Sequence, residues 1–330
     1  MTVDMKPTQP RYWLITSPRT ASNMLVKILN LDGQGVRPAN LGGYFFMPSA
    51  LKRIARLHKP MNTWTEEERA EMQEAQQQCL DNLQDHIAKA ETEGQIIYVK
   101  EHAMLMNDPV KENEYTHGPN MGKSKPLRVR GLEDHSRSKL NLTSLPDAFL
   151  KTWNPTFLIR HPAMMLPSYY RTALSDLELD GMKRANKDLQ NSEATLRWVR
   201  SLYDFYAAYF PEGSPWPLVL DADDVMQNQE LVKRYAAMAG LDPEKVRFTW
   251  DKVPQEAIEK MPSTHQRMLS SLIASDKVDT SKLAGNIDIA KEAIKWRSEF
   301  GEEAGAKLEK WVRDAMPDYE YLHSKRLRMV

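Results

Sequence analysis

The chain has 330 residues, of which 41% are hydrophobic and 8% aromatic, and this composition excludes a wholly disordered protein. Forty-five Lys and Arg balance forty-five Asp and Glu, so no overall basic field favours nucleic acid or an anionic membrane as partner. The single cysteine, Cys79, excludes an internal disulfide and favours a reducing compartment. The opening segment MTVDMKPTQP is polar, unlike a signal peptide or membrane anchor. These features predict a soluble, cytoplasmic protein.

The first strand is predicted over 11–16, where an apolar run follows the polar opening segment, and a helix is predicted over 21–31. The stretch after this helix is punctuated by Gly and Pro and is predicted to be a loop, with an aromatic cluster at 44–46. Thr65 and Glu68 form a capping-box signature. They predict the start of a long polar helix that ends near the next glycine.

The second strand is predicted over 95–102 from its β-branched and apolar residues. Polar and charged residues then dominate 107–139, and we expect this stretch to be an insertion or a mobile lid outside the core. The third strand is predicted over 155–160. A helix is expected to start at His161-Pro162, since proline is favoured in the first turn of a helix.

Ser192 is predicted to cap a helix whose apolar residues recur at helical spacing over 196–210. A fourth strand is predicted over 217–220, followed by an acidic cluster, and a further helix over 228–240 ends at a glycine. The remaining C-terminal part is predicted to be mainly helical.

Strands that alternate with helices predict an α/β fold with a mostly parallel central sheet and helices on both faces. Neither an internal repeat nor a linker interrupts the sequence, so a single domain over 1–330 is expected. In such folds, ligands gather beyond the carboxyl ends of the strands. The polar residues of interest follow predicted strand ends.

The turn after the first strand is rich in hydroxyls and holds one cation, Arg19. Backbone N–H groups, hydroxyls and a cation meet there at the start of a helix, an arrangement that suits an anion. A nucleotide-hydrolysing P-loop would need Gly-Lys-Ser/Thr to grip phosphates and magnesium, and that pattern is absent. The alternative is a capped helix start with an exposed arginine.

Two further strand ends carry candidate site residues. Arg160 ends the third strand and Ser168 lies eight residues on, so the two could clamp a phosphate by charge-assisted hydrogen bonds. His102 ends the second strand, and histidine is the commonest general base because its usual pKa lies near neutrality. Each has a structural alternative: an arginine at a strand end, a serine on a solvated helix face and a packed histidine.

Taken together, four motifs resemble those of the PAPS-dependent sulfotransferases, a family with a P-loop NTPase-like fold. "TSPRTASNML" resembles the family's 5′-phosphosulfate loop, "IRHPAMMLPSYYR" its 3′-phosphate motif, "YVKEH" its Lys-Thr-His and "LDADDVM" its Tyr-Glu-Asp-Leu. Three features depart from the family pattern. Ala21 stands where the family usually has Gly, Asn23 replaces a hydroxyl, and the C-terminal Arg-Lys-Gly loop has no clear counterpart.

The resemblance implies transfer of a sulfuryl group from PAPS (3′-phosphoadenosine 5′-phosphosulfate) to a hydroxyl or amine of a small hydrophobic acceptor, with PAP as product and no metal. It implies that His102 is the general base and that Lys100 and Arg19 assist catalysis. The residues implied to bind the nucleotide are Arg19, Thr20, Ala21, Ser22, Asn23, Arg160 and Ser168.

Tyr44, Phe45, Phe46 and Met104 are proposed to line the acceptor pocket, although such residues more often belong to a core. The segment 107–139 also carries four basic residues that could close over the nucleotide or form a solvated loop. These are Lys123, Lys125, Arg128 and Arg130.

Two other functions stay open at this point. A nucleotide-dependent small-molecule kinase would need a metal site, for which Asp223 or Asp224 could serve. A non-catalytic or repurposed PAP-binding protein of the same fold is the second. The expected partner is a small-molecule acceptor, with no nucleic acid and no membrane, and a homodimer is left open.

Overall fold

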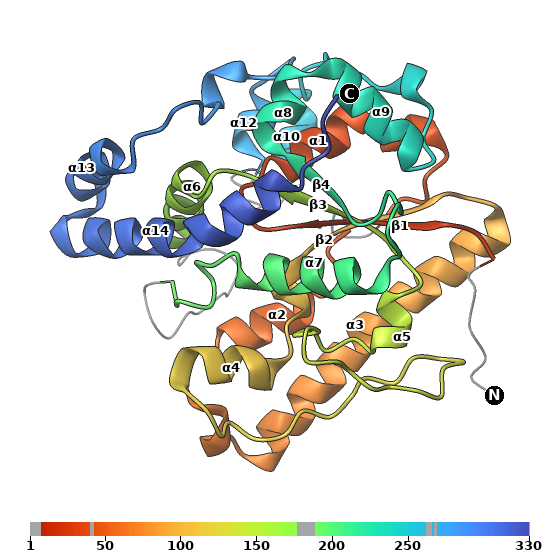
Figure 1. Ribbon diagram of the computed structural model, residues 1–330, viewed down its shortest axis with the longest axis vertical. Helices are drawn as coiled ribbons and strands as arrows, with labels where there is room; N and C mark the ends of the chain where they lie inside the picture. Colours follow the sequence, from red (N-terminus) through yellow and green to blue (C-terminus); the bar gives the residue numbers. More distant parts are fainter. Residues whose placement is uncertain (1–7, 40–42, 177–188, 262–265, 267–268, 330) are drawn as a thin grey trace.

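A sheet of four parallel strands lies at the centre of the part of the chain that the computed structural model describes, residues 8–39, 43–176, 189–261, 266 and 269–329. The strands, β1 (Arg11–Thr16), β2 (Ile97–His102), β3 (Asn154–Ile159) and β4 (Leu218–Asp221), lie in the order β2-β1-β3-β4. Figure 1 shows the sheet with helices on both faces. The predicted α/β fold with a parallel sheet is confirmed.

Helices surround this sheet, with α1, α8 and α9 towards the top of Figure 1 and α2, α3 and α7 below the strands. Within the described residues the helices are α1 (Ser22–Leu29), α2 (Met47–Ile54), α3 (Glu66–Glu93), α4 (Pro109–His117), α5 (Asp147–Leu150), α6 (Pro162–Asp176), α7 (Arg197–Tyr209), α8 (Ala222–Gln227), α9 (Gln229–Met238), α10 (Gln255–Glu259), α12 (Ser270–Ile273), α13 (Ile289–Phe300) and α14 (Glu302–Ser324). The C-terminal part is mainly helical, as predicted.

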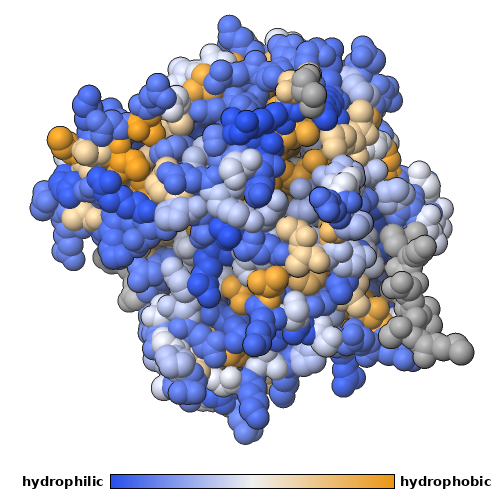
Figure 2. Space-filling model, in the orientation of Figure 1, coloured by the Kyte–Doolittle hydropathy of each residue, from blue (hydrophilic) through white to orange (hydrophobic). Residues whose placement is uncertain are grey.

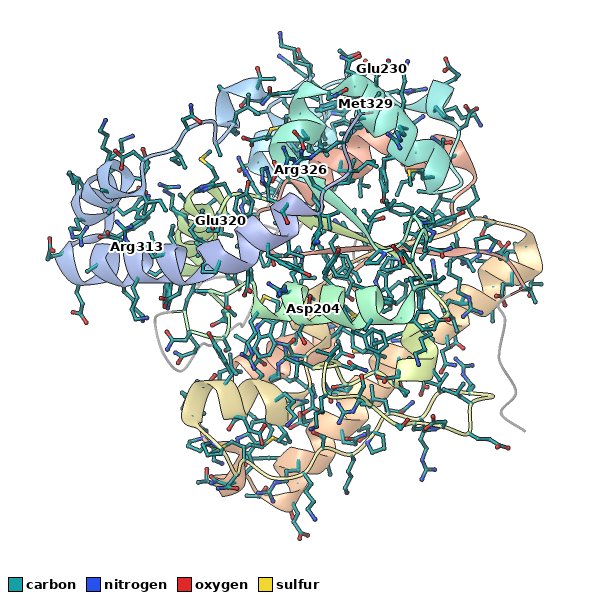
Figure 3. All side chains as sticks on the ribbon, viewed as in Figure 1. Asp204, Glu230, Arg313, Glu320, Arg326 and Met329 are labelled. Atoms are coloured by element: carbon teal, nitrogen blue, oxygen red, sulfur yellow. The ribbon has the colours of Figure 1, made fainter. Side chains whose placement is uncertain are left out.

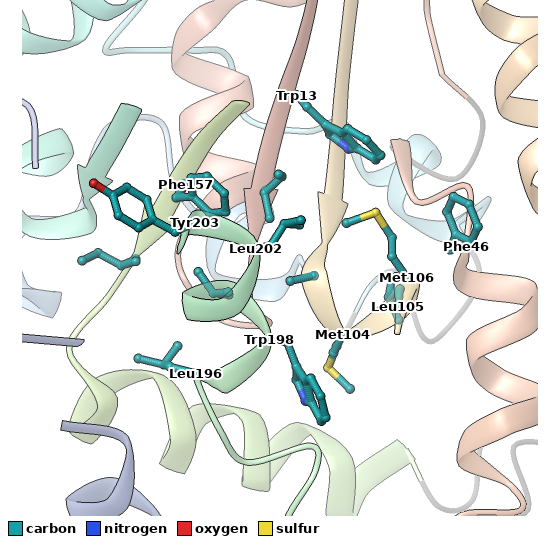
Figure 4. Packing of buried hydrophobic residues seen from close by; sticks show 14 of the residues in the cluster. Trp13, Phe46, Met104, Leu105, Met106, Phe157, Leu196, Trp198, Leu202 and Tyr203 are labelled. Atoms are coloured by element: carbon teal, nitrogen blue, oxygen red, sulfur yellow. The ribbon is translucent and has the colours of Figure 1, made fainter. Parts of the chain in front are cut away.

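Side chains of the strands alternate between two core clusters because successive residues of a strand point to opposite faces. Trp13 and Ile15 pack in one cluster with α3 and α7, whereas Leu14 packs in the other with α1 and α9. Figure 4 shows part of the first cluster, where Trp13 and Phe157 of the sheet lie near side chains of α7. Both faces of the sheet are therefore covered, as parallel sheets require.

The register of the sheet brings the strand ends together at one edge. Thr16, the last residue of β1, pairs with His102, the last residue of β2. On its other side, Thr16 pairs with Leu158, next to the end of β3. Turns that follow β1, β2 and β3 therefore start side by side, at the edge where the sequence predicted a ligand site.

Local signals predicted α3 and α9 correctly. The Thr65 hydroxyl accepts the Glu68 N–H at 3.2 Å, and the Glu68 carboxylate accepts the Thr65 N–H at 2.8 Å, which completes the capping box. α3 ends at Gly94, whose φ of 65° is left-handed. The Asn228 side chain caps α9 by accepting the Leu231 N–H at 3.0 Å.

The prediction that Ser192 caps the helix over 196–210 is wrong. α7 begins at Arg197, whose N–H is accepted by the Thr195 hydroxyl at 3.1 Å, and the N-cap residue Leu196 makes no side-chain cap. Ser192 instead lies in the turn before the helix, where its carbonyl accepts the indole N–H of Trp198 at 2.7 Å. Apolar packing of α7 in the first core cluster, rather than a cap from Ser192, fixes where this helix lies.

The segment 107–139 belongs partly to the core, contrary to the prediction. It contains α4, and its Leu127 and Val129 are buried in the first core cluster. Arg128 bonds Gln77 of α3 through its backbone N–H and C=O, and Arg130 donates to the Asp81 carbonyl. The apolar side chains between the charged residues pin this segment along α3.

The face of the molecule in Figure 2 is mostly hydrophilic, with apolar residues in small scattered groups. Among the described helices, none combines the length and the hydropathy that crossing a membrane requires.

Candidate active site

The turn between β1 and α1 has a strained backbone. Arg19 and Ala21 have φ angles of 66° and 63°, a left-handed conformation that favours glycine. This explains why a glycine is usual at the position of Ala21 in the resembled motif. The Thr20 hydroxyl is buried and donates to the Ser17 carbonyl at 2.9 Å. Thr20 therefore stabilises the turn by a hydrogen bond inside it.

The turn meets the residues that follow β3. The Arg19 Nε donates to the Ser168 Oγ at 2.9 Å, and Arg160 donates to the Arg19 carbonyl at 3.2 Å. Arg160 also donates to the Lys282 carbonyl at 2.7 Å, yet its buried Nε has no partner among the described residues. Burial lowers the pKa of Arg160; the nearby Asp223 carboxylate opposes this shift, and the Arg19 cation adds to it. Two neighbouring cations and an unsatisfied N–H group mark a place for an anion.

His102 and Lys100 lie at the end of β2, on the same side of the strand. The His102 Nδ1 lies 2.5 Å from the Thr16 Oγ1, and the Lys100 ammonium donates to the Asn23 side chain. The Tyr44 ring covers both groups, with its centroid 4.6 Å from the His102 ring and 4.4 Å from the Lys100 Nζ. The predicted catalytic pair is therefore held against the turn after β1.

Burial sets the protonation of this pair. It lowers the pKa of Lys100 to about 8, because removal from water penalises the ammonium form. Burial, and then the nearby Lys100 cation, hold the pKa of His102 well below its usual range. His102 is therefore a neutral imidazole at neutral pH, the form that can accept a proton.

Glu101 lies on the opposite side of β2 and was not predicted to serve the site. Its carboxylate accepts the Phe46 N–H at 2.9 Å and the His102 N–H at 3.0 Å. Burial raises the pKa of Glu101 to about 8. The carboxyl ties the loop that carries Tyr44 to β2, so it helps to place that ring over His102.

A cavity of about 450 Å³, here called the central cavity, opens at this edge of the sheet. One group of lining residues, the cationic wall, comes from the turn, the residues after β3 and the C-terminal part, and consists of Arg19, Arg160, Ser168, Lys277 and Lys282, with the Asp279 carboxylate among them. A second group, the apolar wall, comes from α2 and the 3₁₀ turn after β2, and consists of Met47, Leu51, Ile54, Met104 and Leu105. Further apolar lining residues, such as Met164 and Leu272, come from α6 and the C-terminal part. His102 and Tyr44 line the same cavity.

Most of the residues chosen from sequence meet at the central cavity. Those that line it are Arg19, Ala21, Ser22, Asn23, Tyr44, His102, Met104, Arg160 and Ser168. Lys100 lines an adjoining hollow of about 910 Å³, which shares Asn23 and Trp250 with the central cavity.

Phe45 and Phe46 do not line the cavity, contrary to the prediction. Phe46 is fully buried in the first core cluster, where α2 begins, and the Phe45 ring packs edge-on against His86 at 5.1 Å. Only Tyr44 of the aromatic cluster turns towards the site. None of the four basic residues predicted to cover the nucleotide from 107–139 lines it either.

The C-terminal part supplies site residues that the sequence did not reveal. Besides Lys277 and Lys282, Trp250 lines the cavity, and its indole N–H donates to the Ser275 carbonyl at 3.0 Å. Next to Lys282, the N–H of Ala284 donates to the Asp223 carboxylate at 2.9 Å. The loop that holds Lys282 and Ala284 contacts Arg160, which directly follows β3, through the Lys282 carbonyl. It does so although it carries no Arg-Lys-Gly sequence.

The two carboxylates considered for a metal are engaged elsewhere. The Asp223 Oδ2 accepts the N–H groups of Ala284 and Gly285. Arg326 pairs with Asp224 at 2.7 Å, beyond the end of α14, where Figure 3 labels it. The Asp223 Oδ1 is buried with no hydrogen-bond partner among the described residues, and this carboxylate also lies near the Arg160 cation.

Fold and site together define an α/β protein with a cationic pocket and a neutral histidine at its strand ends. No family model matches the chain. It is 41% identical over 335 residues to the sulfotransferase ppzF of Metarhizium rileyi, covering 98% of each chain, and 41% identical over 333 residues to the sulfotransferase ppzF of Metarhizium majus, covering 96% of this chain and 97% of the relative.

The chain therefore belongs to the sulfotransferase family. Among solved structures, the sulfotransferase domain of the Synechococcus PCC 7002 olefin synthase matches 93% of this chain and 96% of its own, at 12% identity and a TM-score of 0.38.

Proposed function

We propose that the chain transfers a sulfuryl group from PAPS to a hydroxyl or amine of a small apolar acceptor, with His102 as general base. One observation carries this proposal. A cationic wall, a neutral imidazole and an apolar wall line one cavity at the edge where β1, β2 and β3 end.

The cationic wall fits the two anionic ends of PAPS. The unsatisfied Arg160 Nε and the Ser168 hydroxyl, which lies 2.9 Å from the Arg19 Nε, suit a phosphate beside the end of β3. Arg19 and the helix start at Ser22 suit a second anion in front of the turn. Lys277 and Lys282 also line the cavity from the C-terminal part, where Lys282 pairs with Asp279 at 3.4 Å.

The residues at the end of β2 suit the transfer step. The donor supplies the sulfuryl group, and the acceptor oxygen takes it while its proton passes to the neutral His102. Lys100 and Arg19 offset negative charge on the sulfonate and on the leaving phosphate. A general base contributes about 10²–10⁴-fold to such a rate.

The apolar wall suits a hydrophobic acceptor. Met47, Leu51 and Ile54 follow one another at spacings of four and three, so they share one face of α2. Met104 adds an adaptable thioether beside His102 in the chain. An acceptor held on this wall can place its hydroxyl within reach of the imidazole.

The departures from the family motif support an intact site rather than a non-catalytic one. Ala21 adopts the left-handed backbone that the turn needs, and Asn23 accepts a hydrogen bond from Lys100. For the kinase alternative, Asp224 is paired with Arg326 and one oxygen of Asp223 accepts backbone N–H groups, so neither carboxylate is fully available to a metal.

Thermal denaturation with added nucleotides tests this proposal. PAP should raise the melting temperature more than Mg·ATP at equal concentration, since PAP carries the 3′-phosphate that the cationic wall suits. AMP serves as the matched control, because it differs from PAP only by that phosphate. Stabilisation by Mg·ATP with no response to PAP would overturn the proposal in favour of a kinase.

A further inference from the structure

We propose that Thr16 holds the His102 ring in the tautomer that carries its proton on Nδ1, so that Nε2 is the nitrogen that accepts a proton from the acceptor. Thr16 is thus a positioning residue that acts through His102. The inference rests on the proposed function of His102 as general base.

The register of the sheet creates the contact. Thr16 ends β1 and His102 ends β2, and the parallel pairing places the two residues side by side. The Thr16 Oγ1 lies 2.5 Å from the His102 Nδ1 and 3.3 Å from the Glu101 carbonyl oxygen. Thr16 is fully buried, so water does not compete for its hydroxyl.

The chemistry of the three atoms sets the direction of the bonds. A carbonyl oxygen can only accept, so the Thr16 hydroxyl proton points to Glu101 when both contacts are satisfied. The Thr16 oxygen must then accept from Nδ1–H of His102. The reverse arrangement would turn the hydroxyl proton away from the Glu101 carbonyl.

The surroundings keep the ring in this orientation. The Glu101 carboxylate accepts the His102 backbone N–H at 3.0 Å, and the Tyr44 ring packs against the imidazole. No described residue bonds Nε2, and His102 lines the central cavity. A ring that lost Thr16 could carry its proton on either nitrogen, and the form protonated on Nε2 cannot act as base there.

Nitrogen-15 NMR of the ring and steady-state kinetics test the inference together. The wild-type His102 signals, assigned by their loss in His102→Asn, should show a protonated Nδ1 and an unprotonated Nε2. Thr16→Val removes the hydroxyl at nearly constant shape and should lower kcat by at least about tenfold, a part of what a general base contributes. Its PAP affinity should stay within a few-fold, and Thr16→Ser should keep both the tautomer and most of kcat.

Thr156→Val is the matched control, because it removes a buried threonine hydroxyl from the neighbouring strand β3. It should leave kcat and the His102 signals near those of the wild type. A wild-type ring protonated on Nε2 overturns the inference by itself, so that spectrum and Thr16→Ser decide the matter even where Thr16→Val fails to fold.

The same experiment separates the inference from the function on which it rests. If His102→Asn keeps normal turnover, the base role of His102 is wrong, whatever the tautomer. If His102→Asn is inactive but Thr16→Val keeps both kcat and the Nδ1–H tautomer, the role of Thr16 is wrong and the base role stands.

Discussion

The two walls of the central cavity are built in different ways. The cationic wall is held by hydrogen bonds to backbone carbonyls, because Arg160 donates to the carbonyls of Arg19 and Lys282. The apolar wall consists of side chains on one face of α2 and on the turn after β2. The first depends on the course of the chain where the strands end, whereas the second depends on which side chains α2 and the turn after β2 present. Substitutions on the apolar wall should therefore alter acceptor choice without a change in donor binding.

The largest effect is expected from Arg160→Ala. Loss of charge-assisted hydrogen bonds to a phosphate should weaken PAP binding by about 10–100-fold, from roughly 1.5–3 kcal/mol per bond to a charged group. Binding of adenosine 5′-phosphosulfate, which lacks the 3′-phosphate, should change little. Calorimetric titration of both ligands measures this.

The control is Arg313→Ala, which removes an exposed arginine of α14 that Figure 3 labels and that pairs with Glu309. Its PAP affinity should equal that of the wild type. Equal losses for both ligands in Arg160→Ala would show that Arg160 does not distinguish the 3′-phosphate.

A smaller effect, on the acceptor rather than on the donor, is expected on the apolar wall. Leu51→Trp fills part of the cavity and should raise the KM of a bulky phenol about tenfold, in line with 1–3 kcal/mol for overpacking. PAP affinity should stay unchanged. Lys52→Trp, next to it but exposed on α2, should leave both constants alone. If Leu51→Trp also weakened PAP binding, donor and acceptor would not bind to separate walls of the cavity.

The pH profile of kcat/KM should then fall through about 8. Lys100, whose pKa burial lowers to about 8, is a cation below that pH and loses its charge above it. Activity should halve near that pH, and no rising limb is expected near 6.5, because the pKa of His102 lies well below its usual range.

Glu101 also has a raised pKa of about 8, so a variant must separate the two groups. Lys100→Arg keeps its charge through this range and should move the falling limb upwards. If the fall of kcat/KM near pH 8 does not move in Lys100→Arg, the fall comes from Glu101, and the role of Lys100 is contradicted.

The smallest effect concerns the turn itself. Ala21→Gly should stabilise the protein by about 1 kcal/mol or less, because relief of the left-handed strain exceeds the added entropy of the unfolded chain. Ala236→Gly, inside α9, should instead destabilise it by about 1 kcal/mol. Denaturant unfolding of both variants measures the difference, and destabilisation by Ala21→Gly would contradict the assigned strain.

The division between the walls also explains what the sequence could predict. Arg19, His102 and Arg160 each follow a strand that has its own apolar signal, and parallel pairing brings such ends together. Lys282 meets Arg160 across 122 residues of chain, and no local pattern encodes that contact.

Two predictions from the sequence were wrong because they depended on contacts between distant parts of the chain. The aromatic cluster at 44–46 gave no sign of which ring would enter the core, since that depends on how Glu101 ties Phe46 to β2. In 107–139, isolated apolar residues such as Leu127 were hidden among charges, although they anchor the segment along α3.

Transfer of ³⁵S from labelled PAPS to a panel of small phenols and alcohols tests the central claim most directly. The wild-type chain should move label into an apolar acceptor, and His102→Asn should lower that rate by about 10²–10⁴-fold while it binds PAP within a few-fold of the wild type. Label that stays on PAPS with every acceptor, or a folded His102→Asn chain that transfers it at the normal rate, would contradict the account.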